Sequence, residues 1–200
     1  MRNRTLVLVV IGIILFYTSN SLFAQEADLF STSKHKIGFT YSYGSQNLFN
    51  VKYYYHVNLF QLQYLYALSR KPALGVDFLV QPQYNVSKFR YISDIPIESG
   101  GYEFGMNAGI LLRKNLFKNM LNLYTFISSG PHYVSGTPIR QSNRFIISSN
   151  FSIGLNIKLD ENMYLDIRSG LRHISNAGMS EANAGVNNLV IGGGILVPIF

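Results

Sequence analysis

Apolar and polar residues alternate along most of this chain with a period of two. Between Phe145 and Leu159, one set of alternate positions is mostly apolar and the other is polar or small. Successive side chains of a β-strand point to opposite faces, so the segment predicts a strand with one apolar and one polar face. It is well over twice as long as the average strand of ~5–6 residues, which favours a strand that crosses a membrane.

Eight segments of this kind can be marked along the chain. They span residues 35–46, 51–68, 73–84, 102–113, 119–133, 144–159, 162–175 and 186–199. The links between them alternate between short turns and longer loops, and the longer loops are residues 86–101, 134–143 and 176–185. Only the first link, residues 46–50, is short where this rule predicts a long loop. Short turns at one end and long loops at the other are typical of outer-membrane barrels. We therefore predict an all-β fold, an eight-stranded antiparallel transmembrane up-and-down β-barrel.

The interior of an eight-stranded barrel is just wide enough to be filled by side chains, which argues against a pore. The polar positions of the sixth and seventh segments would fill it: Asn150, Asn156, Lys158, Asp166, Arg168 and Arg172. A buried charge requires a partner, so we expect Asp166 to pair with an arginine or lysine inside the barrel.

The N-terminal segment has the pattern of a secretory signal. Arg2 and Arg4 precede an apolar run that ends at Tyr17, and a polar patch and a small residue follow. The run is shorter than the ~20 residues that a spanning helix needs. We predict that residues 1–24 are a cleaved signal peptide and that residues 25–200 form the barrel. An uncleaved N-terminal anchor is the alternative.

Composition excludes several classes of function. The chain has no cysteine, so it has neither disulfides nor thiolate metal sites. Its 17 Lys and Arg outnumber 10 Asp and Glu, but they form no long basic run, so we expect no nucleic-acid partner. The positive excess instead suits anionic lipid head groups. The four histidines show no i, i+4 pair and no acidic cluster nearby, so no metal site is predicted.

The apolar face of the seventh segment continues into His173 and Ser175, next to a long loop. If this face meets lipid, the two polar side chains point at the bilayer, where polar groups are rare and mostly functional. Residues i and i+2 share one face of a strand. Histidine can accept a proton near neutral pH and so activate a serine hydroxyl. The pair alone also fits two interfacial polar residues without chemistry.

The remaining histidines carry less information. His35 and His56 have the pattern of ordinary strand residues. His132, near the end of the fifth segment, either lines the same groove as His173 or lies at the membrane interface.

The residues that follow His173 resemble a known family. The stretch His-Ile-Ser-Asn-Ala-Gly at 173–178, with the positions up to 196, is similar to the lipid A 3-O-deacylases of Gram-negative outer membranes. The resemblance implies an eight-stranded barrel in which His173 is the general base and Ser175 the nucleophile. It also implies residues near the developing oxyanion, where hydrogen-bond donors lower the barrier: Asn176, Gly178 and Asn183.

The chain departs from that family at one position. The family has an acidic residue fourteen positions after the histidine, and this chain has Asn187 there. Asn187 can still hold the imidazole tautomer through its carbonyl oxygen, as in Cys-His-Asn sites. Alternatively, Glu181 in the same loop supplies the carboxylate, or the activity is lost.

The resemblance implies an outer-membrane serine esterase that removes an ester-linked acyl chain from lipid A without a cofactor. Its partner would be the lipid A or lipopolysaccharide of the outer leaflet of a Gram-negative bacterium. The alternative is a non-enzymatic outer-membrane barrel with a structural role or with loops that bind a partner.

Overall fold

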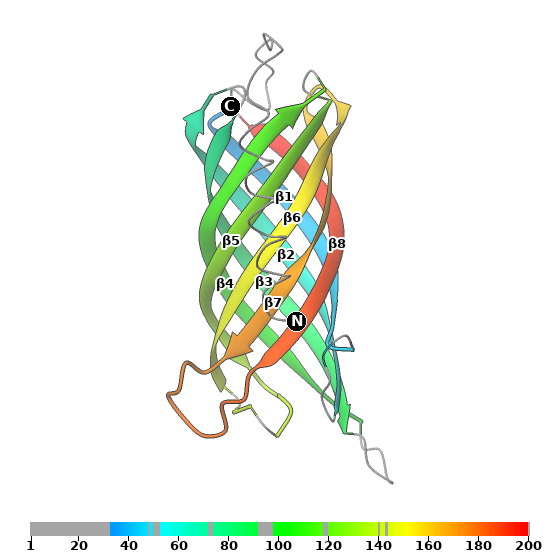
Figure 1. The fold of residues 1–200 in the computed structure, drawn as a ribbon, viewed down its shortest axis with the longest axis vertical. Coiled ribbons are helices and arrows are strands. Elements are labelled where there is room, and N and C mark those ends of the chain that lie inside the picture. Colours follow the sequence, from blue (N-terminus) through cyan, green and yellow to red (C-terminus); the bar gives the residue numbers. More distant parts are fainter. Residues whose placement is uncertain are drawn as a thin grey trace, which may run out of the picture.

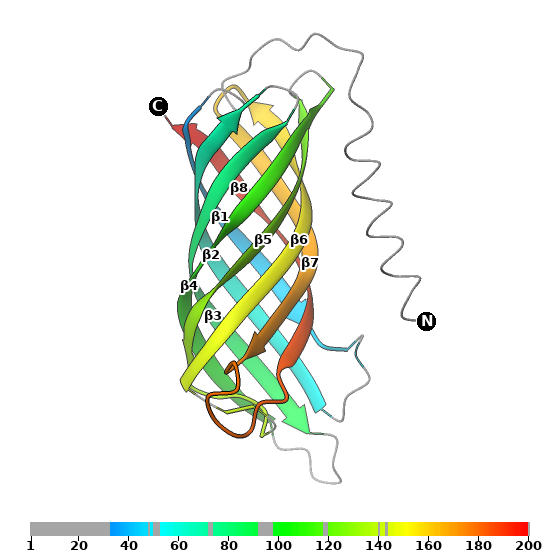
Figure 2. The same ribbon diagram turned by 60° about the vertical axis from the view of Figure 1, so that its left-hand side comes forward.

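The computed structural model describes residues 33–47, 49, 53–71, 74–91, 98–117, 120–139, 141–142 and 144–199. Eight antiparallel strands follow one another around a closed barrel, in which β8 pairs with β1 (Figure 1, Figure 2). Their bounds are β1 His35–Ser45, β2 Tyr53–Arg70, β3 Gly75–Tyr91, β4 Glu98–Leu116, β5 Leu121–Val134, β6 Arg144–Asp160, β7 Met163–Ser175 and β8 Val186–Ile199. The predicted all-β, eight-stranded, up-and-down barrel is confirmed.

The predicted signal peptide, residues 1–24, lies outside the described residues. Among the residues that are described, no helix has the length and apolar character needed to cross a membrane.

The wall of the barrel is apolar outside and largely polar inside. On β1, Ile37, Phe39 and Tyr41 are exposed, whereas Thr40 and Ser42 are fully buried. The period-two pattern of the sequence therefore has the orientation of a membrane barrel, in which alternate residues face lipid and the lumen.

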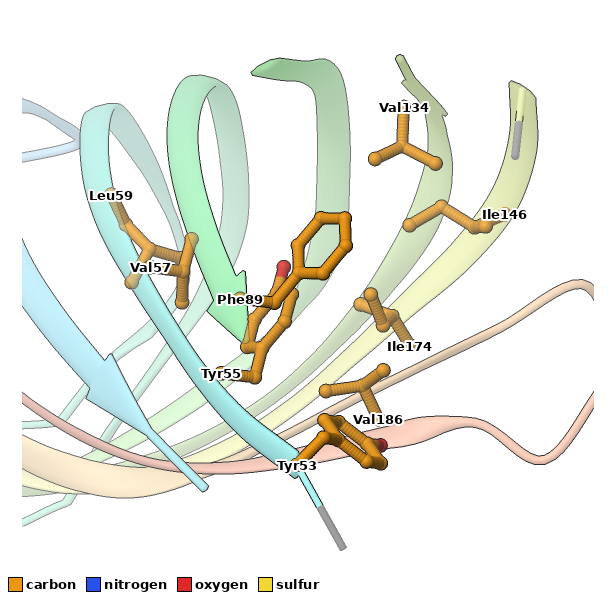
Figure 3. Close-up of a cluster of buried hydrophobic side chains, with 9 residues drawn as sticks. All are labelled: Tyr53, Tyr55, Val57, Leu59, Phe89, Val134, Ile146, Ile174 and Val186. Carbon is orange, nitrogen blue, oxygen red and sulfur yellow. The ribbon is translucent and has the colours of Figure 1, made fainter. Parts of the chain in front are cut away.

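Apolar side chains close the barrel interior at the end that carries the long loops. They come from six strands and point inward (Figure 3): Tyr53, Tyr55, Val57, Leu59, Phe89, Val134, Ile146, Ile174 and Val186. A second apolar cluster lies toward the short turns and consists of Leu65, Leu79, Leu111, Tyr124, Phe126, Tyr164 and Leu196. Side chains thus fill the lumen, as expected for eight strands.

Charged groups between these clusters are buried in pairs. Asp166 accepts hydrogen bonds from Arg168 at 2.8 and 3.0 Å and from the Tyr124 hydroxyl at 2.7 Å. The predicted pairing of Asp166 with a basic residue inside the barrel is therefore confirmed. Glu103 is held in the same way by Arg172 and by His132. Such pairing offsets the large desolvation penalty of a buried charge.

The third and fourth strands are longer than the sequence predicted. Residues 86–91 and 98–101, expected to belong to a long loop, continue β3 and β4, and Ser87 pairs with Gly101. The glycines suggested a loop, but Gly101 has a packing role. A Cβ atom there would lie 2.6 Å from the carbonyl oxygen of Gly136, which follows β5. The close approach of two backbones therefore requires this glycine.

The two ends of the barrel differ in their connections. Only residues 161–162 join β6 to β7, whereas residues 176–185 form a long loop between β7 and β8, at the lower end in Figure 1. In outer-membrane barrels the long loops face the cell exterior. The carboxyl end of β7 therefore lies at the outer side of the membrane.

The Asp166–Arg168 pair should stabilise the barrel strongly. Asp166→Ala would leave the Arg168 guanidinium buried without its carboxylate, so we expect the free energy of unfolding to fall by about 3–5 kcal/mol. Urea unfolding in detergent micelles measures this. Glu161→Ala, which removes an exposed carboxylate in a turn, serves as the control and should change stability by less than about 0.5 kcal/mol. Equal effects of the two substitutions would contradict the expectation.

Candidate active site

The last residues of β7 place a histidine and a serine on the outer wall. His173 is exposed and Ser175 is half-buried, whereas Arg172 and Ile174 between them are buried inside. Both polar side chains therefore share the outward face, next to the β7–β8 loop, as the period-two pattern predicted.

A neighbouring strand fixes the imidazole ring. His173 pairs with Asn187 of β8 across the sheet, and its Nδ1 lies 2.7 Å from Asn187 Oδ1. An amide oxygen only accepts hydrogen bonds, so Nδ1 carries the proton in this contact. The other ring nitrogen, Nε2, is then left with the lone pair that a base requires.

Glu181 has a different position from Asn187. Its side chain is exposed in the β7–β8 loop, and in the described part of the chain no hydrogen bond joins it to His173. The structure thus brings His173 together with Asn187 and not with Glu181.

The absence of a side chain at Gly185 leaves space for the imidazole ring of His173. It has a φ of +68°, and a Cβ atom there would lie 2.6 Å from Cε1 of His173. Glycine alone satisfies both the positive φ and the close approach. Sequence reasoning assigned this residue no role beyond its place in the family-like stretch, although a glycine directly before a strand is a signal of such a constraint.

The residues predicted near the oxyanion form one hydrogen-bonded unit directly after Ser175. Asn176 accepts a bond from the Gly178 N–H at 2.9 Å and donates its own N–H to Asn183 Oδ1 at 2.9 Å. The N–H of Met179 donates to the Asn176 carbonyl oxygen at 3.1 Å, and Ala177 and Gly178 both have positive φ. This is the geometry of a type I′ turn. In the structure, the N–H groups of Asn176, Gly178 and Met179 donate to acceptors within the loop itself.

The β5–β6 loop holds this turn in place. Asn176 Nδ2 donates to Ser142 Oγ at 2.6 Å, and the Ser142 N–H donates to the Ala182 carbonyl oxygen at 2.7 Å. Gln141 forms a β-bridge with Asn183. The sequence did not single out Gln141 or Ser142, because contacts between loops leave no periodic signal.

A surface groove of about 320 Å³ lies beside the imidazole. Its lining residues are Phe49, Ser149, Asn150, Phe151, Leu171, Arg172, His173, Asn187 and Asn188. On the outer face, polar His173 and Asn187 are followed toward the short-turn end by apolar Phe151 and Leu171. The groove therefore suits a ligand with a polar group attached to an apolar chain.

His132 neither lines this groove nor lies at the membrane interface, so both interpretations were wrong. Its side chain points into the barrel, where Nδ1 lies 2.5 Å from Glu103 Oε1 and Nε2 lies 2.9 Å from Asn107 Oδ1. The other two histidines bond to tyrosines of adjacent strands, His35 to Tyr64 and His56 to Tyr43. Within the described ranges, no group of three His, Cys, Asp or Glu residues could hold a metal ion.

A closed eight-stranded barrel with an apolar outer wall defines this chain as an outer-membrane β-barrel protein. The family model described as lipid A 3-O-deacylase (PagL) matches residues 60–195, and the chain belongs to this family. Membership of this family and the barrel fold place the protein in the outer membrane of a Gram-negative bacterium.

A solved structure with the same fold is similar to this chain. The crystal structure of the outer membrane enzyme PagL is similar with a TM-score of 0.54 and 12% identity, covering 81% of this chain and 99% of that chain. Neisserial surface protein A (NspA) gives a TM-score of 0.49 and 11% identity over 82% and 96% of the two chains. For the outer membrane protein OprG from Pseudomonas aeruginosa the values are 0.46 and 8% over 82% and 95%. A comparison with curated proteins gave no match.

The contact between His173 and Asn187 can be tested without any substrate. We expect the ring of His173 to hold its proton on Nδ1 in the native protein, because Asn187 Oδ1 accepts it. In Asn187→Ala the two neutral tautomers should mix. Nitrogen NMR of the histidine rings in micelles distinguishes the two states. Glu181→Ala is the matched control and should leave the His173 signals unchanged; a shift as large as that of Asn187→Ala would contradict this assignment.

Proposed function

We propose that the mature protein, exported with removal of residues 1–24, is a serine esterase that removes an ester-linked acyl chain from lipid A. The observation that carries this proposal is the outward pair of His173 and Ser175, with the ring fixed by Asn187 at 2.7 Å. Membership of the deacylase family supports the substrate class.

The first step is acyl transfer to Ser175. His173 Nε2 takes the hydroxyl proton as Oγ attacks the ester carbonyl carbon, because a serine hydroxyl is a poor nucleophile without a base. The tetrahedral intermediate then collapses, the bond between the acyl carbon and the sugar oxygen breaks, and His173 returns the proton to that oxygen. The products are a sugar hydroxyl and an acyl-enzyme.

The second step is hydrolysis of the acyl-enzyme. A water molecule from the aqueous side of the outer interface loses a proton to His173 and attacks the acyl carbon. The bond to Ser175 Oγ breaks, the hydroxyl is restored, and the fatty acid is released. Both lipid and water can reach a site at the end of β7, next to an exposed loop.

The β7–β8 loop would stabilise the negative oxygen of each intermediate. The Gly178 N–H is our candidate donor, and it would exchange its bond with Asn176 Oδ1 for one to the oxyanion. Asn176 and Asn183 act as positioning residues, because their bonds to each other and to the β5–β6 loop hold the turn. The other bonds of the turn can then stay in place, because only this one hydrogen bond is exchanged.

The groove beside His173 would hold the acyl chain. In the outer leaflet, acyl chains run from the head group toward the middle of the bilayer, which is the direction from Ser175 to Leu171 along β7. The apolar side chains of Phe151 and Leu171 lie along that path. The substrate therefore needs no route into the barrel, since the membrane itself delivers it.

Ser175→Ala tests the nucleophile. The substitution removes the attacking oxygen, so we expect deacylation to fall to background while the barrel still folds. Mass spectrometry of lipid A from a Gram-negative host that expresses the protein measures this, and heat-dependent migration in gels reports folding. Ser169→Ala on the same outer face is the control, because Ser169 Oγ bonds its own wall at Val190 O, 3.1 Å away. Unchanged lipid A with wild-type protein that is correctly folded would favour a non-enzymatic barrel.

Substitutions of Asn187 and Glu181 test which residue orients the base. Asn187→Ala should lower kcat by about tenfold, the equivalent of one lost hydrogen bond of ~1.4 kcal/mol. Glu181→Ala should stay within about twofold of wild type. Asn187→Asp should raise kcat several-fold, because a carboxylate stabilises the imidazolium that forms in the transition state. A larger loss in Glu181→Ala than in Asn187→Ala would reverse the assignment.

A further inference from the structure

Four polar side chains form a row across the outer wall. Ser129 of β5 pairs with Ser149 of β6, Ser149 pairs with His173 of β7, and His173 pairs with Asn187 of β8. All four are on the outward face, because their neighbours Ser128, Ser148, Arg172 and Asn188 are buried inside. With strands ~4.8 Å apart, the row is about 14 Å wide. The polar surface thus extends two strands beyond the histidine.

Apart from Ser175, the outward residues next to this row are apolar. The adjacent outward row toward the short turns consists of Ile127, Phe151, Leu171 and Leu189. On the loop side, the next outward residues along β5 and β6 are Pro131 and Ile147, which pair with each other. Polar groups facing lipid are costly and tend to mark sites with a function. The serines at 129 and 149 therefore interrupt an otherwise apolar surface next to the candidate base.

The two serines retain unused hydrogen-bonding capacity. Their hydroxyl oxygens are 2.9 Å apart. Each hydroxyl has one donor and two acceptor lone pairs, so this contact uses one of the two hydrogens. Ser169, another outward serine on β7, is different, because its hydroxyl donates to the carbonyl oxygen of Val190 in the wall itself. Ser149 also lines the groove that His173 lines.

We propose that Ser149, supported by Ser129, is a second polar subsite that binds the amide joining the neighbouring acyl chain to the same sugar. The inference rests on the proposed function, since it places the scissile ester at His173 and Ser175. Ser149 and His173 are paired on neighbouring strands, ~4.8 Å apart, so two linkages on adjacent carbons of one sugar ring could meet the two positions together. An amide has a carbonyl oxygen for the free hydroxyl hydrogen and an N–H for an oxygen lone pair.

This subsite would give the protein a preference among acyl glycolipids. An ester next to an amide would engage both polar positions, and the two chains would lie side by side over Phe151 and Leu171. An ester with no amide beside it would leave the serines facing hydrocarbon. Discrimination arises because a site built to bond a polar group binds an analogue without that group more weakly.

Two defined glycolipids in mixed micelles test the subsite. The first is a glucosamine with one ester-linked and one amide-linked acyl chain, and the second has a hydroxyl in place of the amide-linked chain. Each is bound to Ser175→Ala protein, which allows affinity to be measured without turnover, and hydrolysis is measured in the active protein. The variant is Ser149→Ala and the matched control is Ser169→Ala.

We expect Ser149→Ala to weaken binding of the amide-bearing glycolipid by about three- to tenfold, the effect of one hydrogen bond. Its binding of the second glycolipid should stay unchanged, KM should rise in the active protein, and kcat should stay constant. Ser169→Ala should change none of these values. Equal losses of affinity for both glycolipids would overturn the subsite, because Ser149 would then support the structure of the wall and not bind the amide. A fall in kcat alone would also overturn it, because Ser149 would then affect the position of His173.

The same measurements separate the two proposals. Hydrolysis by wild type with no effect of Ser149→Ala would refute the subsite and leave the esterase intact. Binding that depends on Ser149 without any hydrolysis by wild type would refute the esterase and support a polar site for acyl glycolipids. Gel migration of each variant confirms that the barrel has folded.

Discussion

Closure of the hydrogen-bonded ring is the constraint on which the rest of this structure depends. Hydrocarbon offers no partner for a backbone N–H or C=O, so strands that cross a membrane must bond to one another around a complete circle. The pairing of β8 with β1 completes that circle here. Once it is closed, each residue has one of two environments, lumen or lipid, and its position along the strand decides which. The chemistry of the site follows from that alternation.

Because of this alternation, β7 contributes side chains both to the barrel interior and to the outer wall. On β7, Asp166, Arg168 and Arg172 face inward and take part in the buried ion pairs. His173, one residue further along, faces outward with Ser175. Substitutions on the inner face should therefore act mainly on stability, and those on the outer face mainly on chemistry. The two loops bonded through Ser142 and Asn176 then fix the turn that follows the serine.

Much of the fold could be predicted from period two alone, because burial in a barrel depends only on position along a strand. The outward direction of His173 and the pairing of Asp166 follow from it. The full lengths of β3 and β4 could not, since the contact of Gly101 with Gly136 joins segments far apart in sequence. The choice between Asn187 and Glu181 depends on the register of β7 with β8, which the sequence does not encode locally. The position of His132 was predicted wrongly, although the alternation along β5 indicates it. The residue next to it, Tyr133, is exposed, so His132 faces the lumen.

Asn187 holds the imidazole through a neutral amide and not through a carboxylate. A carboxylate at this depth would be an ion at the edge of hydrocarbon and would need compensating charges nearby. An amide places only a dipole there, and its oxygen is already bonded to the imidazole. The outer wall can therefore hold the imidazole in place without adding a charge to the surface that faces lipid.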